Sequence, residues 1–197
     1  MSPEKGEQQS TTNHLDGLAP EQRERASASK TRGRTIRLAI VVVLILATAV
    51  LLRLYVYESD IVEGSSMSPG LRSGDFVLIC KLGCDRYRPE RFDVITFRAP
   101  DAKDVLIKRV IGLPGEWVWV WGDQVLVDGS RLVEPYRATS RGAYDAPVYV
   151  PEGSIYVLGD NRDSSEDSRT WGPIPVSSVR GSAVFVYFPF GRARLVR

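Results

Sequence analysis

The chain has 197 residues, of which 43% are hydrophobic and 25% are charged, a composition typical of a folded protein with one domain of ordinary size. Its net charge is +2, and residues 58–197 carry eighteen Lys and Arg against nineteen Asp and Glu. Nucleic-acid-binding proteins concentrate positive charge on one face, so this nearly neutral stretch argues against a nucleic-acid partner.

The N-terminal residues predict a tail followed by a membrane anchor. Residues 1–35 are polar and lack an aliphatic pattern, so we predict a disordered tail. Residues 36–57 contain the run LAIVVVLILATAVLL, in which Thr48 is the single polar residue. Because about 20 helical residues cross a bilayer core, we predict a transmembrane helix over residues 36–57.

A cleaved signal peptide is the alternative, because Ala47-Thr48-Ala49 has the small-x-small pattern of a cleavage site. We favour a retained anchor, since the leader would be unusually long and apolar residues continue directly after Ala49. Lys and Arg crowd the N-terminal side of the run, whereas acidic residues follow it. The positive-inside rule therefore predicts a cytoplasmic N-terminus, a single crossing and an extracytoplasmic domain over residues 58–197.

The remaining residues predict an all-β domain. Short segments rich in Val, Ile, Phe, Tyr and Trp are separated by Gly, Pro, Asp and Ser, which is typical of strands joined by turns. The predicted strands are 75–80, 92–98, 104–111, 117–121, 124–128, 147–150, 155–158 and 182–188. Such a pattern favours a closed or partly open barrel, or a sandwich, of mostly antiparallel strands.

Two local patterns leave alternatives open. Trp117, Trp119 and Trp121 alternate, so they share one face of a strand, which is either part of the core or a surface that contacts the membrane. Cys80 and Cys84 either form a small disulfide or remain two thiols. A metal site is not expected there, since no second Cys/His pair exists to complete four ligands.

A constrained turn between Gly64 and Pro69 contains the hydroxyls of Ser65, Ser66 and Ser68. A serine acts as a nucleophile only when a base accepts its proton, and histidine is the usual base. The single histidine, His14, lies in the predicted tail on the other side of the membrane. A Ser-His-Asp triad is therefore excluded, and lysine is the best remaining base.

The predicted β domain contains three lysines. Lys103 lies in a charged loop, where solvent and acidic neighbours are expected to keep it protonated, and Lys81 flanks the probable turn between the cysteines. Lys108 alternates with Leu106 and Val110 on one face of a predicted strand, where burial lowers the pKa of an amine. The alternative is a lysine that reaches solvent from a strand edge.

Three blocks of the sequence resemble, in order, the conserved regions of bacterial type I signal peptidases. Residues 64–69 with 74–78 resemble the nucleophile region, and residues 106–116 resemble the general-base strand. Residues 159–169, GDNRDSSEDSR, resemble the acidic loop. The three blocks follow the predicted anchor in the right order, and the resemblance covers most of residues 58–185.

The resemblance implies a role for each matching residue. Ser66 matches the nucleophile, which also donates its backbone N–H to the oxyanion; Lys108 matches the general base, and Ser165 the hydroxyl that orients its amine. Two salt bridges are implied, Arg109–Asp160 and Asp167–Arg169. Residues implied at the substrate pockets are Val62, Met67, Leu71, Leu106 and Ile107.

One position departs from the family pattern. Some members have a serine two positions before the nucleophile that helps to hold the oxyanion, and here that position is Gly64. The second oxyanion donor is then another backbone amide, the Ser65 hydroxyl or water.

The resemblance implies a membrane-bound serine endopeptidase that removes signal peptides from exported preproteins, with small residues at positions −1 and −3. It implies a bacterial plasma-membrane location and the signal-peptidase-like β fold, with no metal or organic cofactor. The alternatives are a self-cleaving repressor-type Ser–Lys protease, which would be soluble and carry a DNA-binding domain, and a non-catalytic, membrane-tethered β domain that binds exported proteins.

Overall fold

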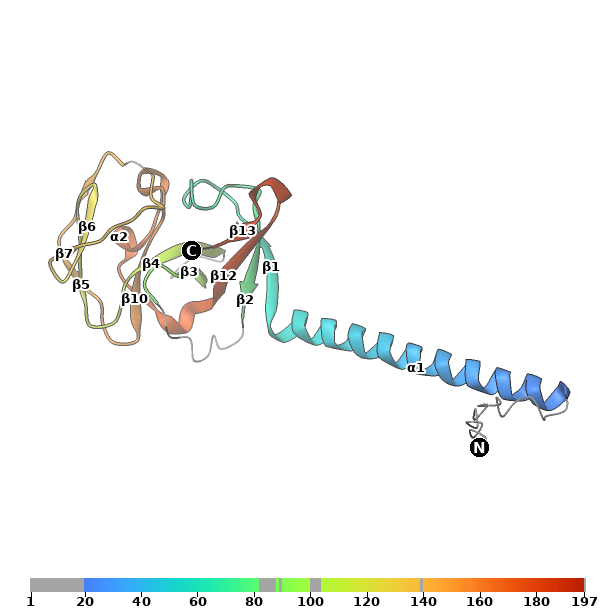
Figure 1. Cartoon of the computed structure of the whole chain (residues 1–197). Helices are drawn as coiled ribbons and strands as arrows, with labels where there is room; N and C mark the ends of the chain where they lie inside the picture. Colours follow the sequence, from blue (N-terminus) through green and yellow to red (C-terminus); the bar gives the residue numbers. More distant parts are fainter. Residues whose placement is uncertain (1–19, 82–87, 89, 100–103, 139, 197) are drawn as a thin grey trace, which may run out of the picture. The chain divides into compact units, whose positions relative to one another are not determined.

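The computed structural model describes residues 20–81, 88, 90–99, 104–138 and 140–196 (Figure 1). The chain divides into two compact units, Met1–Val50 and Leu51–Arg197. The first unit contains most of one long helix, and the second contains the β strands. Cys84 and Lys103 lie outside the described residues, so both alternatives for Cys80 and Cys84, a disulfide or two thiols, stay open predictions.

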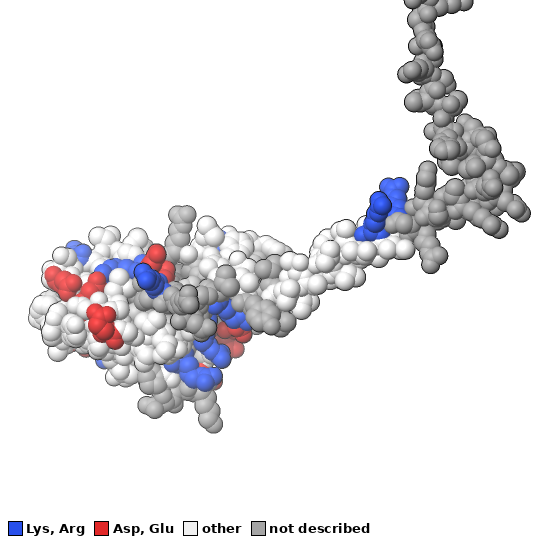
Figure 2. Space-filling view, turned by 90° about the horizontal axis from the view of Figure 1, so that it is seen from below, with Lys and Arg blue, Asp and Glu red and all other residues white. Residues whose placement is uncertain are grey.

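The helix α1 (Pro20–Tyr55) begins well before the predicted anchor. Residues 20–35, which we predicted as disordered, are helical, and this part of the prediction was wrong. Proline is favoured in the first turn of a helix, and the Glu, Gln, Arg and Ala residues that follow extend a helix nucleated by the apolar run. Residues Arg34–Leu51 are long and apolar enough to cross a membrane. In Figure 2, the Lys and Arg atoms of this segment lie at its N-terminal end.

The larger sheet of the second unit contains eight strands (Figure 1). Their order is β1-β2-β12-β3-β4-β10-β11, with β13 paired to β12, and every pairing is antiparallel. The strands are β1 (Tyr57–Ile61), β2 (Phe76–Cys80), β3 (Val94–Arg98), β4 (Val105–Gly112), β10 (Ser154–Leu158), β11 (Ile174–Pro175), β12 (Val179–Phe188) and β13 (Arg194–Leu195).

A smaller antiparallel sheet is inserted between β4 and β10. Its order is β7-β6-β5-β8, and β9 also pairs with β5. These strands are β5 (Trp117–Gly122), β6 (Gln124–Val127), β7 (Ser130–Arg131), β8 (Ala143–Tyr144) and β9 (Val148–Tyr149). Short helical turns complete the unit: η2 (Arg162–Ser164), α2 (Ser168–Trp171), η3 (Val176–Ser178) and η4 (Phe190–Arg192).

The predicted all-β class is confirmed, and each of the eight predicted strands overlaps an observed one. Neither sheet closes on itself among the described strands, so the partly open form is the one adopted. Five of the described strands were missed: β1 and the two-residue strands β7, β8, β11 and β13. The residues of β1 were assigned to the end of the anchor and the polar segment that follows. At the start of β1, Tyr57 pairs with Cys80 of β2.

Tryptophan and valine alternate along β5, so the two kinds of side chain face opposite sides of the sheet. Val118 and Val120 are buried in a core cluster with Ile111 and Leu158. Because neighbouring side chains of a strand face opposite ways, the tryptophans point away from this core. Trp117 and Trp121 are 53% and 51% exposed, so the core interpretation of the tryptophan stripe was wrong.

Gly112 allows the two sheets to pack closely. A Cβ at this position would lie 2.4 Å from Val118 Cγ2 and 3.0 Å from Tyr156 Cβ. We expect Gly112→Ala to lower the free energy of unfolding by about 1–3 kcal/mol, because it overpacks a filled core. Urea denaturation followed by tryptophan fluorescence measures this change.

Gly191→Ala is the matched control. No atom lies within 4 Å of a Cβ built at Gly191, and its φ is not positive. We expect this variant to change the free energy of unfolding by no more than about 0.5 kcal/mol. Equal destabilisation by the two variants would contradict the packing argument.

Candidate active site

The loop between β1 and β2 carries the serine-rich turn and is held at both ends. Val62 N donates to Asp75 O at 2.8 Å, and Gly74 N donates to Val62 O at 2.9 Å. Within the loop, Ser68 N donates to Ser65 O at 3.0 Å. These hydrogen bonds fix the backbone on either side of Ser66.

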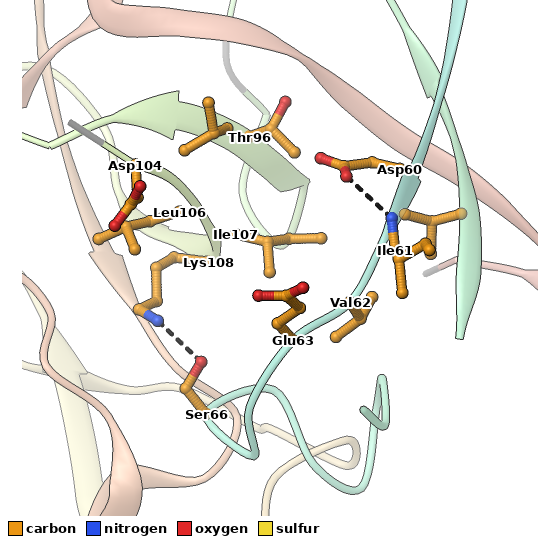
Figure 3. Close-up of a pocket in the computed structure, with 12 residues that line it drawn as sticks. Asp60, Ile61, Val62, Glu63, Ser66, Thr96, Asp104, Leu106, Ile107 and Lys108 are labelled. Carbon is orange, nitrogen blue, oxygen red and sulfur yellow. Dashed lines mark hydrogen bonds between the residues drawn. The ribbon is translucent and has the colours of Figure 1, made fainter. Parts of the chain in front are cut away.

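Lys108 and Ser66 are in direct contact. Lys108 Nζ lies 2.8 Å from Ser66 Oγ, and the two side chains meet at one end of a cleft (Figure 3). The β3–β4 register, in which Ile95 opposes Lys108, places the lysine within the larger sheet. Its side chain reaches the serine across 42 positions of sequence.

Burial changes the acid–base behaviour of Lys108. The residue is 4% exposed, and burial lowers the pKa of its amine below the ordinary value of 10.5. The nearby carboxylates of Asp167 and Glu166 act in the opposite direction. Lys81 contrasts with it, since this lysine is partly exposed and lies 3.8 Å from Glu58.

The acidic loop is attached directly to the serine-rich turn. Asn161 N donates to Ser66 O at 2.9 Å, and Asn161 Nδ2 donates to Ser65 O at 3.3 Å. Gly159 permits this approach, because a Cβ there would lie 2.6 Å from Ser66 O and 2.2 Å from Ser165 Oγ. Sequence reasoning did not single out Asn161, although it lies within the block that resembles the family's acidic loop.

A buried ion pair joins β4 to the acidic loop. Arg109 Nε and Nη2 donate to the two carboxylate oxygens of Asp160, both at 2.8 Å, and both side chains are almost fully buried. Arg109 Nη1 also donates to Phe92 O, and the guanidinium lies 3.8 Å from the ring centroid of Tyr136. No local pattern around Tyr136 indicated this contact, since it depends on the packing of two distant segments.

The second expected ion pair also forms. Arg169 Nε donates to Asp167 Oδ1 at 2.8 Å, and the same guanidinium donates to the carbonyl oxygens of Arg162 and Ser165. Asp167 in turn accepts from Gly159 N at 3.0 Å. The loop is therefore held by its own charges, and the carboxylates of Asp160 and Asp167 are hydrogen-bonded.

Ser165 does not make the hydrogen bond that the resemblance implied. Its Oγ is buried and has no hydrogen-bond partner among the described residues, whereas Lys108 donates to Ser66. The hydroxyl instead lies against Gly159. In this structure Ser165 is next to the site and is not bonded to the lysine.

The cleft beside Ser66 has a volume of about 460 Å³. Of the predicted pocket residues, Val62, Leu106 and Ile107 line it. Met67 and Leu71 do not, because both are 1% exposed and pack in the core with Val77 and Ile79. In this structure both residues pack in the core cluster that also contains Val62, and their assignment to the substrate pockets stays a prediction.

The turn leaves one backbone donor available. Among the described residues, Ser66 N–H has no hydrogen-bond partner. Gly64 has a φ of +82°, a left-handed conformation that strains any residue with a Cβ, so a serine at this position would carry a backbone cost. Ser65 is exposed beside it.

Within the described residues, no group of three or more His, Cys, Asp or Glu is arranged to hold a metal ion. The chemistry that the site offers is that of a hydroxyl next to a buried amine. A neutral amine at 2.8 Å can accept the hydroxyl proton, which makes the serine oxygen a nucleophile.

Comparison with known proteins gives consistent matches. The family described as "Signal peptidase, peptidase S26" matches residues 35–188. The chain is similar to signal peptidase I of Bacillus caldolyticus, with 39% identity over 153 residues that cover 71% of this chain and 84% of the relative. It is also similar to a probable signal peptidase I-1 of Synechocystis, with 38% identity over 152 residues, 73% of this chain and 77% of the relative.

A crystal structure of a signal peptidase I from Enterococcus faecalis is 35% identical, covers 50% of this chain and 98% of that one, and has a TM-score of 0.44. The family match includes the apolar helix segment, the serine-rich turn, the lysine strand and the acidic loop. The chain belongs to the signal peptidase family, peptidase S26.

Proposed function

We propose that this chain is a membrane-bound serine endopeptidase that cleaves signal peptides from secretory preproteins, with Ser66 as nucleophile and Lys108 as general base. The observation that carries the proposal is the 2.8 Å contact between Lys108 Nζ and Ser66 Oγ at the end of the cleft. Family membership supports the same activity.

The reaction follows from this contact. Neutral Lys108 accepts the Ser66 proton as Oγ attacks the scissile carbonyl, and Ser66 N–H donates to the oxyanion that develops. Lys108 then gives the proton to the leaving amine, which leaves an acyl-enzyme on Ser66. Lys108 next takes a proton from water, whose oxygen attacks the ester carbonyl. The bond to Ser66 Oγ then breaks, Lys108 returns the proton to Oγ, and the cleaved signal peptide leaves with a free carboxyl terminus.

The substrate adds an extended strand to exposed sheet edges. Residues 105–108 of β4 pair with β3, but β10 pairs only with Arg109 and the residues beyond it. The strand β1 lies at the other side of the cleft, and β2 is its only partner among the described strands. An extended peptide between these two edges gains main-chain hydrogen bonds, and the apolar side chains of Val62, Leu106 and Ile107 favour small residues at −1 and −3.

The membrane helix confines the enzyme to the plane in which its substrates are inserted. This raises the effective concentration of the enzyme near its substrates. We propose that it spans a bacterial plasma membrane, with the tail cytoplasmic and residues 58–197 extracytoplasmic. Arg34 and Arg37 at its N-terminal end and Glu58 and Asp60 after it support this orientation.

Removing either member of the dyad should abolish turnover. We expect Ser66→Ala and Lys108→Met to lower kcat by roughly 1,000-fold or more, because each loses the nucleophile or its base. The assay is preprotein cleavage in detergent, with the new N-terminus sequenced. Lys81→Met, which removes an amine outside the cleft, should retain activity. Wild-type rates for Lys108→Met would exclude the dyad.

The pH–rate profile should report the Lys108 amine. Because burial lowers its pKa below 10.5 and the neutral form is active, kcat/KM should rise with pH through a limb below that value. The measurement is kcat/KM of the wild-type protein from acidic to alkaline pH. A flat profile would contradict a titrating lysine base.

The same burial predicts a stability cost. The folded state binds the lysine proton less tightly than the unfolded state, so Lys108→Met should raise the free energy of unfolding at neutral pH by about 1.4 kcal/mol for each unit of pKa lowering. As the pH rises towards 10.5, the unfolded wild-type chain also loses its proton and the difference should shrink. Urea denaturation at two pH values tests this; a difference that grows with pH would refute it.

A further inference from the structure

Three carboxylates line the cleft that ends at Ser66. Asp60, Glu63 and Asp104 are all exposed, and they lie on the two walls between which the substrate is proposed to bind (Figure 3). Asp60 Oδ1 accepts from Ile61 N, but none of the three takes part in an ion pair with a described residue.

The cleft lacks a compensating cation among its described residues. Among the described residues that line it, Lys108 is the only basic one, and burial lowers the pKa of that amine. The cleft therefore carries negative charge, which the nearly balanced charge of residues 58–197 did not reveal.

Of the three carboxylates, Glu63 is the best placed to contact a substrate residue close to the scissile bond. It follows Val62, which lines the apolar part of the cleft, and precedes Ser66 by three residues. Figure 3 shows its carboxylate in the cleft alongside Ile107, near the contact between Lys108 and Ser66. A substrate residue close to the scissile bond passes within reach of this carboxylate.

The geometry of an extended peptide indicates which substrate residues meet the carboxylates. Successive side chains of a strand point to opposite faces. If residues −1 and −3 point into the apolar pockets, residues −2 and −4 point towards the exposed rim, where the acidic side chains lie.

We propose that the cleft selects preproteins with a Lys or Arg at position −2 or −4, with Glu63 as the main determinant of this preference. The inference rests on the proposed function, because it requires the substrate to occupy this cleft. Exposed ion pairs contribute little each, so the expected preference for Lys over Ala is about three- to fivefold in kcat/KM.

The test compares three peptide substrates that differ only at −2, with Ala, Lys or Glu, and a second set that differs at −4. The full chain in non-ionic detergent should cleave the Lys peptide fastest and the Glu peptide slowest in at least one set. Glu63→Gln should bring the Lys/Ala ratio of kcat/KM towards one, and Glu63→Lys should reverse the order in favour of the Glu peptide.

Glu152→Gln is the matched control, because Glu152 is an exposed carboxylate outside the cleft. Its Lys/Ala ratio should equal that of the wild type. The wild-type ratio should also fall as salt is raised from low to molar concentrations, because screening weakens exposed charge pairs.

The outcomes separate this inference from the proposed function. A wild-type protein that cleaves no peptide refutes the proposed function itself. A wild-type protein that cleaves all of them with a Lys/Ala ratio of one, or with a ratio that salt does not change, overturns the charge selection and leaves the peptidase activity intact. The salt series decides the matter even where a Glu63 variant loses all activity.

Discussion

The site depends on one buried amine. Lys108 is 4% exposed, so its charged form loses hydration that a protein interior replaces poorly. That cost lowers the pKa of the amine and allows it to act as a base towards Ser66, 2.8 Å away.

The charges around Lys108 do not cancel the lowering of its pKa by burial. Asp167 and Asp160 both favour the ammonium form of Lys108, but each is bound to an arginine, Arg169 or Arg109. An unpaired buried carboxylate would be costly and would hold the lysine proton strongly. The ion pairs thus stabilise the acidic loop and limit its influence on the amine.

The acidic loop also positions the nucleophile through the backbone. Asn161 N donates to Ser66 O, and Gly159 allows the two segments to approach. The proposed catalytic pair and its supports therefore come from three distant segments that meet where β4 ends its pairing with β10. The same interruption leaves residues 105–108 without a β10 partner, so one feature of the sheet supplies both the proposed base and the proposed binding edge.

Much of this site was predictable from residue inventory and local pattern. The single histidine in the tail excluded a triad, alternation singled out Lys108, and the family blocks indicated Ser66 and both ion pairs. The sequence was a poorer guide to residues whose surroundings depend on which face of the chain is buried. Met67 and Leu71 are core residues, and Trp117 and Trp121 point outward. Ser165 is not bonded to the lysine. The sequence by itself determined which groups are available for chemistry and the order of the strands along the chain. Only the tertiary structure decided which of them are desolvated, which carboxylates remain unpaired in the cleft, and which ring packs on Arg109, because those properties arise from contacts between segments far apart in sequence.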